Sequence, residues 1–356
     1  MGLLDRIYAT GRFTMSVLKK MVTIKSKPDR GFRQFFNDDI KSTKGVKFWI
    51  RRRNRRIATD INVYEKGQIV RSDKTSQKFF IGANFDNKFD YSALEEFETT
   101  NGADGSVIDD NYKALVENTA EGMAEIDDAF ERAEELMCSQ VMLTGVVTMN
   151  NGTDVDFKRQ ASSLVAYAAG NDFSISTVNP ETVFVRGAEF IISEGNFASG
   201  TIFNVILGES AFIAFKNNPI VQAQGNLRRM DYIETKTGTP IQGLTPQGVY
   251  SAGSHNFKIY TYKGYYNHPT TGALTNFMDP KAMVMFPENL TYDFVYFPTK
   301  NMVKNGDRVI PRLVAGKRSF YEIVKEEECA IQMGERSCFL PIITDVDSIW
   351  TATILN

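Results

Sequence analysis

Two pairs of aspartates are the residues of this sequence best suited to chemistry. Asp154 and Asp156 are two positions apart, as are Asp345 and Asp347, so in a strand each pair would share one face. Paired carboxylates can bind a divalent cation, or separate their pKa values for general acid and base catalysis. Turns and strand ends favour aspartate as well, and we expect a structural role for both pairs.

Other reactive residue types are sparse. His255 and His268 are the only histidines, neither lies near a nucleophile motif, and His255 beside an expected strand start is expected to be structural. The sequence has no G-x-S-x-G, P-loop or H-E-x-x-H motif. Cys138, Cys329 and Cys338 have no metal-binding spacing, and the last two are expected to be buried. We therefore expect no enzyme activity, metal or cofactor, and a reduced, cytosolic setting.

Basic residues concentrate near the N-terminus. Residues 1–60 carry a net charge of +11, whereas the remaining 296 residues carry −13. The densest group is Arg51, Arg52, Arg53, Arg55 and Arg56. These arginines could bind nucleic-acid phosphates, form a solvated edge, or pair with acidic side chains of a neighbouring subunit. The residues alone leave all three interpretations open.

One long helix must organise the elements around these residues. Apolar side chains recur three or four positions apart, which places them on one helical face: Ile108, Tyr112, Leu115, Thr119, Met123, Ile126, Phe130, Ala133 and Met137. Acidic residues lie between them, the last two being Glu134 and Glu135. The pattern predicts a helix over residues 107–140 with an opposite face that is acidic and solvated. Residues 141–149, 150–152 and 155–159 then predict a strand, a turn and a partner strand.

The segments before the helix are predicted to reach other surfaces. Residues 1–45 are typical of an arm, and its aromatic residues Phe32, Phe35 and Phe36 lie on a segment too short for a core of its own. Residues 57–85 alternate in hydrophobicity and predict a two-stranded β-ribbon that turns at Glu65, Lys66 and Gly67. An isolated ribbon is marginally stable, so we expect it to lie on another molecule.

The remaining residues predict a compact mixed α/β region. Helices are expected over 181–193, after Pro180, and from about 209 to before Pro219. Strands are expected over 201–207, 255–266, 280–286 and within 319–355, and loops over 160–178 and 225–254. Residues 298–318 are basic and are expected to be mobile. No run is long and apolar enough for a membrane span, and no secretory signal is recognisable.

This order of elements resembles the major capsid proteins of tailed phages with the Hong Kong 97 capsid fold, and among these the phage lambda type. The resemblance runs from Ile108 to Leu355 and is carried by residues 134–159, which include Val155-Asp156-Phe157-Lys158-Arg159, and by residues 199–215, 263–285 and 319–355. Lys158 stands where the family often has glycine. The order of the passages carries more weight than any single motif.

The resemblance implies an α+β fold with a long spine helix, a peripheral domain with a β-hairpin and sheet, an extended β-ribbon loop and a mixed α/β axial domain. The implied ranges are 1–45 for an N-terminal arm, 46–90 for the extended loop, 91–178 with 311–356 for the peripheral domain, and 179–310 for the axial domain. The spine helix would occupy residues 107–140 of the peripheral domain.

The implied function is that of a major capsid protein that assembles through hexamers and pentamers into an icosahedral head around double-stranded DNA. It would assemble in the host cytoplasm with scaffold, portal and possible decoration proteins, would contact packaged DNA weakly, and would contact no membrane. Contacts between subunits, with ion pairs made by the arginines, are expected at Arg51, Arg52, Arg53, Arg55, Arg56, Glu65, Lys66, Gly67, Arg71, Phe32, Phe35 and Phe36. The alternatives are a nucleic-acid-binding protein that uses residues 51–56 and a metal-dependent enzyme that uses the aspartate pairs.

Overall fold

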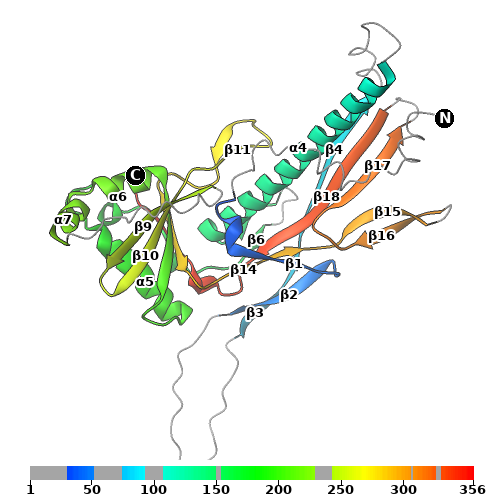
Figure 1. Ribbon diagram of the computed structural model, residues 1–356. Coiled ribbons are helices and arrows are strands. Elements are labelled where there is room, and N and C mark those ends of the chain that lie inside the picture. Colours follow the sequence, from blue (N-terminus) through cyan, green and yellow to red (C-terminus); the bar gives the residue numbers. More distant parts are fainter. Residues whose placement is uncertain are drawn as a thin grey trace, which may run out of the picture.

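A single helix, α4 (Val107–Thr144), runs along one half of the molecule (Figure 1). The computed structural model describes residues 30–51, 74–92, 107–149, 154–228, 243–305, 308–325 and 330–356. With 38 residues α4 is about 57 Å long. It ends at Gly145, whose φ of 75° is left-handed and whose N–H binds the carbonyl of Val141 at 2.9 Å.

The predicted long helix is confirmed, but the strand predicted from residue 141 is wrong at its start. Residues 141–144 continue the helix, and only Val146–Val147 form a strand, β5, which pairs with β6 (Val155–Asp156). Val141 and Met142 are fully buried. Burial of these side chains on the helix outweighs the modest β-propensity of a short β-branched run.

The helix packs on a five-stranded sheet, and together they form the long-helix half of the molecule. The strands are β1 (Phe36–Ile40), β14 (Tyr292–Tyr296), β18 (Ala330–Ile342) and β17 (Ser319–Lys325), in this order, with β4 (Ala83–Ser92) also paired to β18. Phe130 of α4 meets Phe85 of β4, which stacks on Phe339 of β18. Only β1 and β14 pair in parallel. The sheet therefore brings the N-terminal and C-terminal parts of the chain side by side (Figure 1).

A six-stranded sheet with its helices forms the other half, named here the six-strand half. Its order is β7 (Leu164–Val165), β19 (Trp350–Thr353), β13 (Ala282–Pro287), β8 (Ile202–Gly208), β10 (His255–Tyr262) and β9 (Leu244–Ala252). The helices are α5 (Pro180–Gly195), α6 (Glu209–Asn217) and α7 (Pro219–Arg228). Val205 and Met283 face the core that includes α5, whereas Ile206 and Val284 face the core of the long-helix half. Alternation along the strands thus joins the two halves through one sheet.

Smaller elements project from these halves. Three hairpins and four 3₁₀ turns complete the described elements: β2 (Gly45–Arg51) with β3 (Lys74–Ile81), β11 (Tyr265–Asn267) with β12 (Leu274–Asn276), β15 (Thr299–Asn305) with β16 (Arg308–Val314), η1 (Arg33–Phe35), η2 (Ala161–Ser163), η3 (Ala169–Asn171) and η5 (Val346–Ser348). The β2–β3 pair supplies a two-stranded ribbon, and its predicted turn at residues 65–67 lies outside the described residues. No helix in the described ranges is long and apolar enough to cross a membrane.

The remaining predictions succeed where the hydrophobic period is strong. The helices α5 and α6 and the strands β8, β10, β13 and β19 are confirmed. The loop predicted over 225–254 is wrong in its second part, which is β9, and the segment 298–318, which was expected to be mobile, contains β15 and β16. In β9 the pattern is interrupted by Pro246 and by Gly248, where the register with β10 shifts. Within 160–178 the short strand β7 completes the six-stranded sheet.

Candidate functional site: a strap held on the long helix

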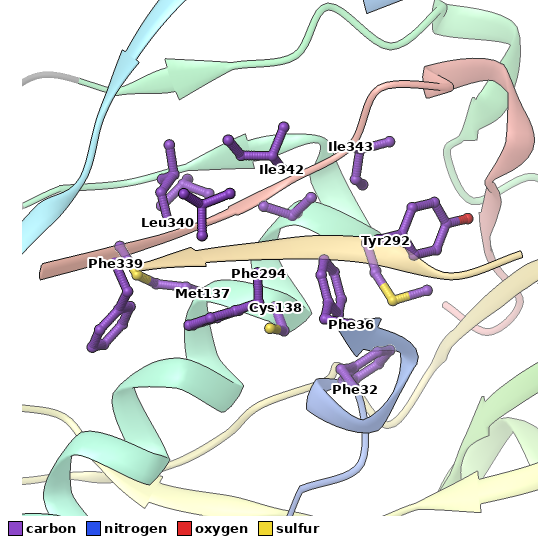
Figure 2. Packing of buried hydrophobic residues seen from close by; sticks show 14 of the residues in the cluster. Phe32, Phe36, Met137, Cys138, Tyr292, Phe294, Phe339, Leu340, Ile342 and Ile343 are labelled. Carbon is purple, nitrogen blue, oxygen red and sulfur yellow. The ribbon is translucent and has the colours of Figure 1, made fainter. Parts of the chain in front are cut away.

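Residues 30–41, here called the strap, cross α4 at Glu131, Glu134 and Glu135 and include the edge strand β1. Phe32 and Phe36 are buried, and Figure 2 shows them turned into the cluster that Phe294 of β14 and Cys138 of α4 also enter. The ring centroids of Phe36 and Tyr292 are 5.5 Å apart. The aromatic residues predicted to contact a neighbouring subunit therefore include two that pack inside their own chain, where a second subunit cannot reach them.

The strap packs closely against β10 and β13 through Gly31 and Phe35. Phe35 packs edge-on against Phe286 of β13, with ring centroids 4.7 Å apart. A Cβ atom at Gly31 would lie 2.4 Å from the ring of Tyr262, so only glycine allows this approach. Arg30 pairs with Glu131 on α4. Residue 30 is thus already attached to the long helix.

Glu135 of α4 holds the backbone of the strap. Its carboxylate accepts hydrogen bonds from the N–H groups of Phe32 at 2.8 Å and Arg33 at 2.9 Å, and from the Tyr262 hydroxyl at 2.8 Å. The residue is 0% exposed. A buried carboxylate is costly unless several donors satisfy it, and here the start of η1 supplies two of them.

Glu134 joins two arginines from opposite ends of the chain. Its Oε2 accepts from Nε of Arg33 at 3.2 Å, and its Oε1 accepts from Arg318 at 2.7 Å and from the Tyr296 hydroxyl at 2.9 Å. Arg33 lies 3.9 Å above the ring centroid of Phe294. One helix residue therefore connects the strap to the segment that enters β17.

The expectation that Glu134 and Glu135 lie on a solvated face is wrong. Both carboxylates are buried, because the strap, β14 and the start of β17 cover this face of α4 near its C-terminal end. One signal was present, since Glu134 follows Phe130 by four positions and precedes Cys138 by four, which places it on the apolar face. The partners of both residues lie more than 100 positions away in the sequence.

Charge and burial shift the protonation of this cluster in predictable directions. Burial lowers the pKa of Arg318, but the charge and hydrogen bond of Glu134 outweigh burial and raise that pKa overall. Burial raises the pKa of Asp38, yet hydrogen bonds from Lys317 and Arg33 prevail and hold it below its ordinary value. The two arginines and Asp38 are therefore charged at neutral pH.

The cysteines of the described chain are protonated and enclosed. Burial raises the pKa of Cys338 to about 11 and that of Cys138 well above its ordinary value. Both thiols are free. The prediction that Cys338 is buried is confirmed, and Cys329 lies outside the described residues.

The aspartate pairs and the histidines take structural positions. Asp156 accepts the N–H of Lys158 at 2.6 Å and so closes a turn, and Asp347 is buried in η5. His255 lies against Phe203 and Phe257, and Nδ1 of His268 accepts the N–H groups of Thr270 and Thr271. Within the ranges that the structure describes, no three His, Cys, Asp or Glu residues gather closely enough to hold a metal ion.

Most of the residues predicted to contact a neighbouring subunit lie outside the described residues. Arg51 is the last residue of β2. The residues that lie outside are Arg52, Arg53, Arg55, Arg56, Glu65, Lys66, Gly67 and Arg71. The described residues stop at Arg51 and resume at Lys74, and these two residues pair with each other in β2 and β3.

What this site does chemically is hold distant segments in register. It consists of directional hydrogen bonds and ion pairs between α4, the strap and the segment before β17.

The family model for phage major capsid protein E matches residues 14–319 of the chain. The chain belongs to this family. No curated protein sequence matches the chain significantly.

Solved structures of similar shape agree with this membership. The capsid protein of a prophage from E. coli CFT073 aligns with a TM-score of 0.59 at 12% identity, over 98% of each chain. A phage-related protein from Bordetella bronchiseptica RB50 aligns with a TM-score of 0.54 at 10% identity, over 95% of this chain and 96% of that chain. The capsid of cyanophage P-SCSP1u aligns with a TM-score of 0.50 at 10% identity, over 94% of this chain and 91% of that chain. At these identities the likeness shows the fold alone.

The capsid protein is thus a structural, shell-forming component of a phage virion. The α+β fold of the Hong Kong 97 type that the sequence predicted is confirmed. The strap and its carboxylates are part of the folding unit that builds this shell. Sequence reasoning identified the helix that carries the site, but assigned the site's two central residues to solvent.

Proposed function

We propose that this capsid protein forms hexamers and pentamers that close into an icosahedral head around double-stranded DNA. The match of the family model over residues 14–319 carries the proposal. A closed shell supplies each subunit with repeated contacts to copies of itself. We propose assembly in the host cytoplasm, with scaffold, portal and possibly decoration proteins as partners, and no catalytic role.

We further propose a division of the chain by role. Residues 1–45 would be the arm, 46–90 the extended loop, 91–178 with 311–356 the peripheral domain, and 179–310 the axial domain. The two halves of the fold support this division in outline. Two strands join sheets beyond these ranges, because β14 enters the five-stranded sheet and β19 the six-stranded one.

Contacts between subunits are proposed at the ribbon that β2 and β3 begin. The face of the ribbon that turns toward the body buries Phe80, which stacks on Phe157 with ring centroids 5.3 Å apart. The opposite face leaves Phe79 59% and Ile81 56% exposed. Large apolar side chains side by side on a surface are typical of a protein contact.

The arginines beyond β2 would add charge to this contact. We propose ion pairs from Arg51, Arg52, Arg53, Arg55 and Arg56 to acidic side chains of a neighbouring copy, with Glu65, Lys66, Gly67 and Arg71 at the same contact. The exposed face of α4 carries acidic residues such as Glu125. Opposite charges on two copies would speed and orient their association.

Expression of the full chain, followed by sedimentation and electron microscopy, tests shell formation. Shells, or rings of five and six copies, are expected for the protein alone or with a co-expressed scaffold. A monomer that stays unassembled even beside its partners from the same phage would contradict the proposal.

Charge reversal tests the arginine contact. Replacing Arg51, Arg52 and Arg53 by Glu should leave the thermal melting of the subunit unchanged and abolish shells. The matched control replaces exposed Lys88, Lys216 and Lys300 by Glu, with shells expected to persist. If the triple arginine variant assembles normally but packages less DNA, the arginines bind nucleic acid instead, and DNA affinity should then fall steeply with salt.

A further inference from the structure

Arg159 lies buried where the two halves of the molecule meet. Its side chain donates to the carbonyl oxygens of Met142 at 2.8 Å and Leu143 at 3.3 Å, which end α4. It also donates to Ser163 O at 3.1 Å, Ile349 O at 2.9 Å and Thr351 Oγ1 at 3.0 Å. The residue is 9% exposed. One guanidinium thus binds three separate segments of chain.

The end of α4 is built to receive this side chain. The last carbonyl groups of a helix have no partner within the helix, and a cation is favourable there. Gly145 takes the carbonyl of Val141, and Arg159 takes the next two. A Cβ atom at Gly145 would lie 2.6 Å from Cδ of Arg159, so the glycine also provides the space for the arginine.

The other acceptors belong to the edge of the six-stranded sheet. Thr351 is in β19 and pairs with Leu164, the first residue of β7, and Ser163 directly precedes Leu164. The planar guanidinium presents its donors in a fixed geometry, so it restricts the orientation of the groups it joins more than a lysine would. Arg159 therefore connects the axis of α4 to the direction of β19.

The five acceptors are uncharged, and this environment is costly for a cation. Burial lowers the pKa of Arg159 to about 10, although Tyr292 and the charge of Asp347 oppose this shift. A well-packed apolar side chain of similar size would often stabilise such a position at least as well as a buried charge. The directional bonds, more than the free energy of burial, explain an arginine at this place.

We propose that Arg159 is a positioning residue that fixes the angle between α4 and the six-stranded sheet, and that this angle sets the curvature of the shell. The second step rests on the shell-forming function. Exposed apolar side chains occur in both halves, such as Phe79 on the ribbon and Ile213 on α6. If copies touch at both places, the angle within one subunit determines the angle between neighbours.

A distance measurement within the subunit tests the first step. Spin labels would be placed at Glu125→Cys on α4 and Lys216→Cys on α6, both exposed, in a Cys329→Ser background. Cys138 and Cys338 are buried and should not react. Pulsed electron paramagnetic resonance should give one narrow distance distribution for native Arg159 and a broader or shifted one for Arg159→Met. An unchanged distribution in a folded Arg159→Met protein overturns the proposal.

A milder variant covers the case in which Arg159→Met does not fold. Thr351→Val removes one of the five acceptors and should broaden the distribution less, whereas Arg132→Met, an exposed arginine on α4, should leave it unchanged. An unaltered distribution in Thr351→Val would count against the proposal in that case.

Shell diameter tests the second step. Electron micrographs of native shells should show one size, and Arg159→Lys or Thr351→Val should give shells of mixed diameter from a folded subunit. Uniform shells of native size from a variant with an altered distance would overturn the link to curvature. Absence of shells from the native chain with its partners would count against the proposed assembly, while the distance measurement would still decide the role of Arg159.

Discussion

The two halves of the molecule solve the same packing problem with different chemistry. In the long-helix half, Glu134, Glu135 and Arg33 are buried together with the partly buried Arg318 among aromatic rings. In the six-strand half the central contacts are between aromatic rings, where Phe184 meets Phe257 at 5.2 Å and Phe215 at 5.4 Å between centroids. Both halves have an apolar core, but the first half adds a buried network of charged groups to it.

The difference follows from which segments each half must bring together. Glu134 binds Arg33 and Arg318, which are 101 and 184 positions away. Hydrogen bonds specify one alignment of such distant segments, whereas apolar contact alone tolerates sliding. In the six-strand half, α5, β8 and α6 follow one another along the chain with short connections, so their alignment needs less specification.

Deletion of the first part of the strap should have the largest effect on stability. Removing residues 1–36 exposes the pocket of Phe32 and Phe36 and leaves Glu134 and Glu135 without strap partners. The loss should be on the order of 5–10 kcal/mol, comparable with the whole stability of a domain. Circular dichroism on heating should show no cooperative transition. Deletion of residues 1–29 is the matched control, because it keeps every described contact of the strap, and should retain the cooperative transition.

Removing the carboxylate of Glu134, which Arg33 and Arg318 share, should have the second largest effect on stability. Glu134→Ala removes the common acceptor of Arg33 and Arg318, which keep their other partners Asp38, Asp127 and Glu335, and should lower the free energy of unfolding by about 2–3 kcal/mol. Urea denaturation measures the change. Exposed Glu125→Ala on the same helix is the control, with an expected change within about 0.5 kcal/mol. Equal effects of the two substitutions would show that the buried network is unimportant.

A substitution in the aromatic core of the six-strand half should lower the free energy of unfolding by less, and its effect should stay within that half. Phe184→Leu should cost about 1–2 kcal/mol, because the smaller side chain leaves part of the ring's space unfilled. Hydrogen exchange should then accelerate in α5 and β10 while the amides of the strap keep their protection. Faster exchange throughout the strap would mean that the two halves unfold as one unit.

The turn at the junction of the halves offers a gain in stability. Lys158 has a φ of 56°, a left-handed conformation that costs a side-chain-bearing residue about 1 kcal/mol and glycine almost nothing. Lys158→Gly should therefore raise the free energy of unfolding by about 0.5–1 kcal/mol. Lys158→Ala keeps the strain and should leave it unchanged, as measured by the urea midpoint.

Acid titration should give the smallest and most diagnostic change. The pKa of Asp38 is lowered in the folded state, so its contribution is present above the unfolded pKa and is lost as the pH falls through the folded value. Asp38→Asn should lower stability at neutral pH, by less than about 1 kcal/mol for a half-exposed group, and the difference should vanish in acid.

Asp293 supplies a comparison of opposite sign. Burial first, and the charge of Asp39 second, raise the pKa of Asp293 above its ordinary value. Ionisation of this group opposes folding, so Asp293→Asn should raise stability at neutral pH and lose that advantage as the pH falls. Urea midpoints from pH 7 to pH 3 measure both variants. Parallel curves for the two would contradict the opposite environments described here.

Local pattern was sufficient for the long helix and for several buried strands, and the fold was implied by the family resemblance. The apolar period of residues 108–137 predicts α4, and similar periods predict α5, β8 and β13, because each is a property of neighbouring residues. The order of these elements indicated the capsid fold before any coordinates. Local pattern failed at β9, β15 and β16, where strands carry polar residues or breaks and are held by pairing with a distant or adjacent strand.

The sequence by itself thus determined the long helix, the order of the elements and the capsid family that they resemble. Only the tertiary structure decided that Glu134 and Glu135 are buried, that Phe32 and Phe36 belong to their own chain's core, and that Arg159 joins α4 to β19. The reason is physical. An amphipathic period depends on residues a few positions apart, whereas the burial of a charge depends on partners that only folding brings within bonding distance.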